Sequence, residues 1–303
     1  MDTYFNIIRK YSGVIFSVSY GIILATQLSL GKLLVASHVH PTQIVFFRCL
    51  IHLFCIAPST FQHETVAFTA YDTTVYFLCA LTGSFSWIFT AYTFLYLEVG
   101  DSTGIELGAT VVFTAIMAHV CLSEYVDKFD VIILVVDVAG IILISKPAFL
   151  FGGMEHYEQN HLKAVLMVSV SALFSSLWPM FVKNLSKMEK LYFMLLNFLH
   201  GAIGVPLTLL CSLFLQPWFT SSSAIIWTLT LLFSVVCLIQ TAVQASALHL
   251  TDAKTVAVSS TISTVLTYVI QLTAFGAAFD WVVISGAFLI AVTVICSQCR
   301  TGL

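Results

Sequence analysis

The sequence predicts an all-α membrane protein in which ten transmembrane helices form two inverted five-helix repeats. Three observations point to this fold class: an apolar composition, ten apolar windows and an internal repeat. Of the 303 residues, 59% are hydrophobic and only 9% are charged, and the mean hydropathy is +0.99. A soluble fold of this size would lack the charged surface that water requires, so lipid must solvate the chain. Helices satisfy the backbone hydrogen bonds of each segment in lipid.

The helices are expected where apolar windows are long enough to cross the bilayer. A hydrocarbon core of about 30 Å needs roughly 20 residues at 1.5 Å per residue. Ten windows meet this length: 12–31, 42–60, 74–97, 103–122, 129–146, 162–183, 191–215, 224–248, 254–275 and 280–298. Pro41, Pro147 and Pro217 lie just outside windows, where a residue that interrupts helices is expected.

The second half of the chain repeats the first. Residues 88–114 recur as 239–265, 151 positions later, in the pairs Ile88/Ile239, Thr90/Thr241, Ala91/Ala242, Leu97/Leu248, Asp101/Asp252 and Thr110/Thr261. Lys32 corresponds to Lys183 at the same spacing, so window 12–31 is expected to stay in the bundle and not to be cleaved as a signal peptide. We expect a first unit at 1–147, a connecting loop at 148–161 and a second unit at 162–303. Five crossings are an odd number, so the second unit enters the membrane from the opposite side.

The distribution of Lys and Arg predicts the orientation. With the N-terminus in the cytosol, three of these residues (Lys32, Lys146 and Lys163) face the other side, and eight face the cytosol: Arg9, Lys10, Lys128, Lys183, Lys187, Lys190, Lys254 and Arg300. Positive residues are enriched in cytoplasmic loops. The sequence therefore predicts a multi-pass protein with both termini in the cytosol, in either the plasma membrane or an endomembrane of the ER or Golgi.

The sequence carries no signature of an enzyme, a cofactor or a metal. It lacks HExxH, GxSxG and P-loop motifs, and no His/Cys cluster has metal-binding spacing. Cys296 and Cys299 form a lone CxxC without a second pair, so the cysteines are expected to act as small hydrophobic residues. A net charge of −3, carried mainly in short loops, gives no basic face. We expect no enzymatic activity, no cofactor, no metal and no nucleic-acid partner.

Several motifs of the first half resemble a known family of membrane proteins. They are the runs LYLEVGD (95–101), CLSE (121–124) and GIILISKPAFLFG (140–152), with Phe47-Arg48-Cys49 and Phe113-Thr114. Together they resemble the EamA-type members of the drug/metabolite transporter superfamily, and among these the group-G branch of solute carrier family 35. The chain departs from the family at Thr110-Val111, where a proline is usual. The second half also lacks counterparts of two charged residues of the first half. Phe275 stands at the position that corresponds to Glu124, and Asn197 or Leu199 stands at the position that corresponds to Arg48.

The resemblance implies a pore between the first four helices and helices six to nine. The fifth and tenth helices are peripheral in that family and often form a dimer contact. The partners implied are a small-molecule solute, the lipid bilayer and a second copy of the chain in a homodimer.

Arg48 is the deepest basic residue of the windows, and His52 lies four residues on, on the same helix face. A charge at mid-bilayer costs about 2.5–3.5 kcal/mol on insertion scales and is retained where something compensates it. Arg48 therefore either meets an anionic or polar group of a solute or forms a structural ion pair with Glu98, Asp101 or Glu124.

Glu106 lies about one turn into window 103–122. It either lines the pore and accepts a coupling proton, or it is an interfacial carboxylate near a helix N-terminus. Neutral polar and aromatic side chains suit a cavity wall and equally suit helix contacts. The candidate substrate-binding residues are Arg48, His52, Tyr92, Tyr96, Glu106, Trp178, Gln240 and Gln244. Asp137, in the middle of window 129–146, is expected to face a neighbouring helix or a dimer partner.

These observations predict a secondary transporter that moves a small organic metabolite by alternating access. The alternative is a non-transporting integral membrane protein that binds or regulates another membrane protein. A continuous polar pocket favours the carrier, whereas the alternative needs its buried polar groups paired and sealed.

Overall fold

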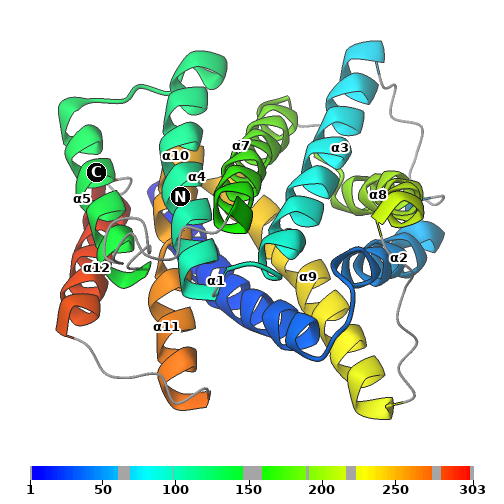
Figure 1. Cartoon of the computed structure of the whole chain (residues 1–303). Helices are drawn as coiled ribbons and strands as arrows, with labels where there is room; N and C mark the ends of the chain where they lie inside the picture. The colour runs from blue at the N-terminus through cyan, green and yellow to red at the C-terminus, as the bar shows by residue number, and fades with distance from the viewer. Residues whose placement is uncertain are drawn as a thin grey trace.

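The computed structural model describes residues 2–60, 69–97, 99–145, 159–188, 191–215, 223–274 and 281–300. This part of the chain is helical and contains no strand (Figure 1), which confirms the all-α class. Its helices are α1 (Asp2–Ala36), α2 (Pro41–Thr60), α3 (Ala70–Thr93), α4 (Val99–Leu122), α5 (Lys128–Ser145), α7 (Gln159–Lys187), α8 (Phe193–Leu215), α9 (Ala224–Leu250), α10 (Ala253–Ser260), α11 (Ile262–Ala274) and α12 (Trp281–Arg300).

Each of the ten predicted windows overlaps a helix, and window 74–97 shows the clearest difference in length. The helix α3 ends at Thr93, and Phe94 to Leu97 form a turn. The Nζ of Lys32, on α1, donates to the carbonyl oxygens of Phe94 at 3.1 Å and Leu97 at 3.0 Å. This contact with a distant helix satisfies carbonyl groups at the helix end, and the apolar pattern of the window gives no sign of it.

Window 254–275 is expected to form one helix, but the helix is interrupted at Thr261, between α10 and α11. The hydroxyl groups of Ser260, Thr261 and Ser263 each donate to the carbonyl oxygen three residues earlier, at 2.6 Å. Such local bonds compete with the regular helical pattern and tighten the turn. The dense run of hydroxyl residues therefore marks a helix break.

Eight helices of the described chain are long and apolar enough to cross a membrane. A further apolar segment, Pro41–Phe54, lies in α2, and α5 carries Asp137 within its apolar sequence. The chain is therefore an integral, multi-pass membrane protein. The predicted connecting loop 148–161 falls mostly outside the described residues, since α7 begins at Gln159.

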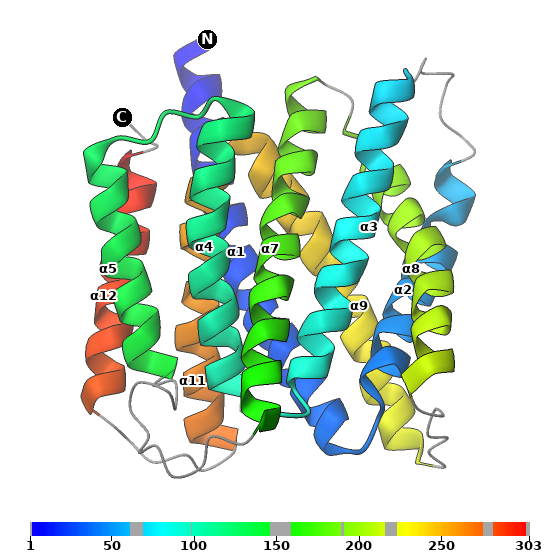
Figure 2. The same cartoon turned by 45° about the horizontal axis from the view of Figure 1, so that its top comes forward.

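The helices pack in pairs that join the first half of the chain to the second. The most extensive contacts are those of α1 with α9, α2 with α8, α3 with α7 and α5 with α12. In Figure 1, α5 and α12 lie together at one edge of the bundle, and α2 and α8 lie at the other. Figure 2 shows that α1 begins and α12 ends at the same side of the bundle, and that α1 and α7 run in opposite directions.

Lys32 and Lys183, which correspond in the internal repeat, make corresponding contacts. Lys32 binds the carbonyl groups that follow α3, as described above. The Nζ of Lys183, on α7, donates to the carbonyl oxygens of Leu248 at 2.8 Å and Thr251 at 2.6 Å, where α9 ends. In each half, a lysine near the end of one helix thus stabilises the carboxyl end of another.

Gly140 on α5 and Gly286 on α12 allow these two helices to approach closely. A Cβ atom added to Gly286 would lie 2.6 Å from the carbonyl oxygen of Gly140, and one added to Gly140 would lie 3.0 Å from the carbonyl oxygen of Gly286. Only hydrogen atoms fit between the two backbones at this crossing, as in close helix contacts of other membrane proteins.

We expect Gly286→Ala to lower the stability of the protein by about 1–3 kcal/mol, because the added methyl group must push the two backbones apart. The measurement is thermal unfolding in detergent. The matched control is Gly108→Ala, since a Cβ atom there would meet Ile141 at an ordinary 3.6 Å. An equal melting temperature for Gly286→Ala and the wild type would contradict the close crossing.

Candidate functional site

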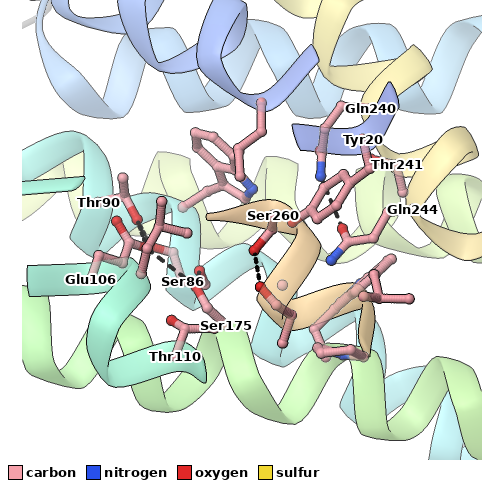
Figure 3. A pocket seen from close by; sticks show the side chains of 18 of the residues that line it. Tyr20, Ser86, Thr90, Glu106, Thr110, Ser175, Gln240, Thr241, Gln244 and Ser260 are labelled. Carbon is pink, nitrogen blue, oxygen red and sulfur yellow. Dashed lines mark hydrogen bonds between the residues drawn. The ribbon is translucent and has the colours of Figure 1, made fainter. Parts of the chain in front are cut away.

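A cavity lies at the centre of the bundle, between the two halves of the chain. The cavity has a volume of about 90 Å³. Its wall is built by residues of α1, α2, α3, α4, α7, α8, α9 and α10. This is the arrangement of helices that the resemblance implies, with α5 and α12 outside the wall. Figure 3 shows Glu106, Thr90 and Ser175 at one end of the cavity and Gln240, Gln244 and Tyr20 at the other.

Arg48, in the cavity wall, is a buried cation without a carboxylate partner in the described chain. Its side chain is 2% exposed, and its Nη1 lies 3.3 Å from the Nε2 of His200. Its Cζ lies 4.5 Å from the ring centre of Trp87, a cation–π contact. The Nε of Arg48 has no hydrogen-bond partner among the described residues. Because a guanidinium group stays charged in proteins, the cavity presents a positive charge that an anionic group can compensate.

The ion pair considered for Arg48 involves three carboxylates. The side chains of Glu98 and Asp101 lie outside the described part of the chain. Glu124 lies after α4, where its Oε1 accepts a hydrogen bond from the backbone N–H of Ala253 at 3.5 Å. Burial and the nearby Asp252 raise the pKa of Glu124 above its usual range.

Glu106 is held by hydroxyl groups of two neighbouring helices. Its Oε1 accepts hydrogen bonds from Thr90 of α3 at 2.8 Å and from Ser171 and Ser175 of α7 at 2.8 and 3.2 Å. The hydroxyl groups of Thr90 and Ser171 also lie 3.0 Å from the carbonyl oxygen of Ser86. They can therefore donate to an ionised Glu106 or turn to Ser86, so the carboxyl group is supported in both protonation states.

Two amide side chains of α9 form the other end of the wall. The Nε2 of Gln240 donates to the Oε1 of Gln244 at 2.9 Å, and the ring of Tyr20 lies beside them (Figure 3). Each amide keeps further donors or acceptors after this bond. This end of the cavity can thus bind polar, uncharged groups.

The structure brings five of the eight candidate residues to the cavity: Arg48, Glu106, Trp178, Gln240 and Gln244. His52 is fully buried behind the wall, with its ring centre 5.4 Å from that of His200. Tyr92 packs edge-on against His40, with ring centres 5.8 Å apart. Tyr96 is 49% exposed and lies in the turn after α3. Tyr96 does not share a helix face with Tyr92, because α3 ends between them.

Sequence reasoning did not select the serine residues that hold Glu106. Ser171 and Ser175 are four residues apart on α7, and Ser86 and Thr90 are four apart on α3. This spacing places each pair on one helix face and could have indicated a polar stripe. His200 is both buried and part of the cavity wall. Among the described residues, no group of three His, Cys, Asp or Glu side chains could hold a metal ion.

Comparisons with known proteins identify the family. Residues 11–146 match the model of the EamA-like transporter family. Solute carrier family 35 member G1 of Homo sapiens is 24% identical over 278 residues, which cover 89% of this chain and 75% of the relative. The Mus musculus protein of the same name is 24% identical over 281 residues, which cover 90% and 76%. The family match and the two relatives support a drug/metabolite transporter-type protein that is similar to solute carrier family 35.

A solved structure supports the fold of this EamA-type protein. A protein known from a crystal structure superposes with a TM-score of 0.70 over 93% of this chain and 99% of its own length. The two sequences are 14% identical, so the likeness concerns the fold alone. The resemblance seen in the motifs is thus confirmed by the family match, and the transporter class by the relatives.

We expect Ser171→Ala to destabilise the EamA-type protein by about 1–3 kcal/mol, because a buried hydrogen bond to the carboxyl group of Glu106 is lost. The readout is the midpoint of thermal unfolding in detergent. Ser169→Ala is the matched control on the same helix, since the hydroxyl group of Ser169 donates only to its own helix, at the carbonyl oxygen of Val165 (2.9 Å). Equal effects of the two variants would contradict the proposed contact.

Proposed function

We propose that this protein is a secondary transporter that moves a small organic metabolite by alternating access. The observation that carries the proposal is the central cavity between the two halves, whose wall holds a buried Arg48 without a carboxylate partner among the described residues. A protein that only binds another membrane protein would gain nothing from an uncompensated charge beside a cavity. A carrier needs such a site, because binding of the solute supplies the missing partner.

The proposed mechanism uses two inverted repeats of five transmembrane helices, at 1–147 and 162–303. The corresponding contacts of Lys32 and Lys183 support this organisation, as do the opposite directions of α1 and α7 (Figure 2). A site between inverted halves can open to either side when one half tilts against the other. We further infer from the distribution of positive residues that both termini face the cytosol.

The chemistry of the cavity suggests what the solute carries. Arg48 is placed to bind an anionic group, while Gln240 and Gln244 offer amide donors and acceptors to hydroxyl or carbonyl groups. Glu106 is the candidate for a coupling proton, because its hydroxyl partners can serve its charged and its protonated forms. The proposed solute is therefore a small metabolite with an anionic group and further polar groups.

A thermal-shift screen of anionic metabolites against the purified protein can identify the solute, since a ligand that binds only the native state raises its stability. Uptake into proteoliposomes then tests transport. We expect Arg48→Ala to abolish uptake and Arg48→Lys to reduce it at least about tenfold, because an ammonium group cannot reproduce the planar donor geometry of a guanidinium group. Lys163→Ala, on an exposed position of α7, is the control. Unchanged uptake by both Arg48 variants would refute the role of this residue.

Glu106→Gln tests proton coupling separately. The amide cannot take up a proton, so we expect the variant to exchange solute across the membrane but to lose the accumulation that a pH gradient drives. The measurement compares exchange and gradient-driven uptake in the same proteoliposomes. Gradient-driven accumulation equal to that of the wild type would exclude Glu106 as the coupling group.

A further inference from the structure

A second polar site lies outside the central cavity, where α5, the break between α10 and α11, and α12 meet. Asp137 of α5 is 0% exposed. Its Oδ1 accepts hydrogen bonds from the hydroxyl groups of Thr261 at 3.1 Å and Thr293 at 2.6 Å. Its Oδ2 has no hydrogen-bond partner among the described residues. Transport through the central cavity leaves this carboxyl group without a role.

The hydrogen atoms of two threonine hydroxyl groups are shared between Asp137 and carbonyl groups of the helices. The hydroxyl group of Thr261 also lies 2.6 Å from the carbonyl oxygen of Val258, and that of Thr293 lies 2.8 Å from the carbonyl oxygen of Ile290. Each hydroxyl group has one hydrogen, so two hydrogens would serve four contacts. A proton on the Oδ1 of Asp137 adds a third: Asp137 donates to Thr293, and both threonines donate to the helix carbonyls.

Charged groups near the site do not replace this proton. Among the described residues of the helices around Asp137, the titratable or charged side chains are Lys254, Tyr268, Cys296, Cys299 and Arg300, with Glu106, His119 and Cys121 on α4 and Lys128 and Asp130 on α5 itself. Among the described contacts of Asp137, hydrogen bonds come from Thr261 and Thr293 alone. A carboxylate without a cation is costly in the low dielectric of a membrane protein, so a bound proton is the available compensation.

The same three helices meet a second time nearer the side on which the chain begins and ends. Asp130, Lys254 and Arg300 each lie seven residues from Asp137, Thr261 and Thr293, respectively, which is about 10 Å along a helix. Lys254 and Arg300 form ion pairs with Asp130 at 2.6 and 3.1 Å. Arg300 also binds Asp127, and this contact holds the pKa of Asp127 below its usual range.

A cavity, here called the vestibule, lies between the two layers. It is lined by Asp130, Ile133, Leu134, Asp252, Lys254, Thr255, Val258, Ser297 and Arg300. The vestibule has a volume of about 120 Å³, whereas a single water needs about 10–15 Å³. Val258 both lines the vestibule and accepts the bond from Thr261. The vestibule can therefore hold water between the ion pairs and the layer of Asp137.

We propose that Asp137 is a proton-binding site that exchanges its proton with water of the vestibule. The carboxylate takes one proton from this water to become the neutral acid and returns it in the reverse step. Loss of the proton draws the hydroxyl group of Thr261 from the carbonyl of Val258 to Asp137, which loosens the tight turn between α10 and α11. Ala253, Val256 and Ser260 of α10 also line the central cavity. Binding and release of the proton therefore change the conformation at the end of a helix that forms the cavity wall.

Infrared spectroscopy of the full chain in lipid nanodiscs tests the proposal without a transported solute. We expect a carboxylic-acid C=O band that grows as the pH is lowered, is lost in Asp137→Asn and is retained in Glu106→Gln. A spectrum in which Asp137→Asn removes no such band, or a band of Asp137 that stays constant across the pH range, would overturn the proposal. The infrared measurement does not depend on solute uptake. The proposed transport function and the proposed proton site at Asp137 can therefore be refuted independently.

Two further variants test the surroundings of Asp137. Thr293→Val keeps the carboxyl group but removes the 2.6 Å hydrogen bond, so the band should shift to higher frequency, and an unshifted band would contradict the contact. This variant also serves if Asp137→Asn fails to fold. Ser297→Leu fills the vestibule, and we expect it to slow the shift of the band after transfer to D₂O several-fold. Exchange at the wild-type rate in a folded Ser297→Leu protein would exclude the vestibule as the route.

Discussion

The scarcity of water inside a bilayer is the constraint on which this structure depends. Every buried polar group must find its partner within the protein, and several do so by reaching a neighbouring helix. Lys32 and Lys183 each reach from one helix to the carboxyl end of another, and Glu106 of α4 is held by α3 and α7. These contacts fix where helices end and which helices pack together.

Against this background, the two sites are marked by Arg48 and Asp137, each of which has one buried polar atom without a hydrogen-bond partner among the described residues. Arg48 and Glu106 lie in the same wall, but the carboxyl group has three hydroxyl donors whereas the guanidinium group contacts an imidazole and an aromatic ring. Because of this difference, an anionic group is expected to bind at the Arg48 side of the cavity. Asp137 shows the same imbalance at the edge of the bundle, with one oxygen bound twice and the other unbound. The helix α10 contacts both regions and can therefore couple them.

The sequence determined the class of protein, the family and most of the helix positions. Apolar windows of sufficient length must become helices in lipid, so their number and order follow from composition and length alone. Ionisable residues within those windows pointed to Arg48 and Glu106, because such charges are retained only where something compensates them. The repeat offset predicted that Lys32 and Lys183 correspond, and their contacts agree with this.

The tertiary structure decided which polar residues meet. The end of α3 at Thr93 depends on a lysine of α1, so the extent of the window could not reveal that Tyr96 lies in a turn. His52 lies behind the wall, whereas Arg48 and His200 line the cavity, a distinction set by the packing of α2 against α8. The layers formed by Asp137 and Asp130 join three helices that are far apart in the chain. Helical periodicity places residues on one face of their own helix, but it carries no information about which face of another helix lies opposite.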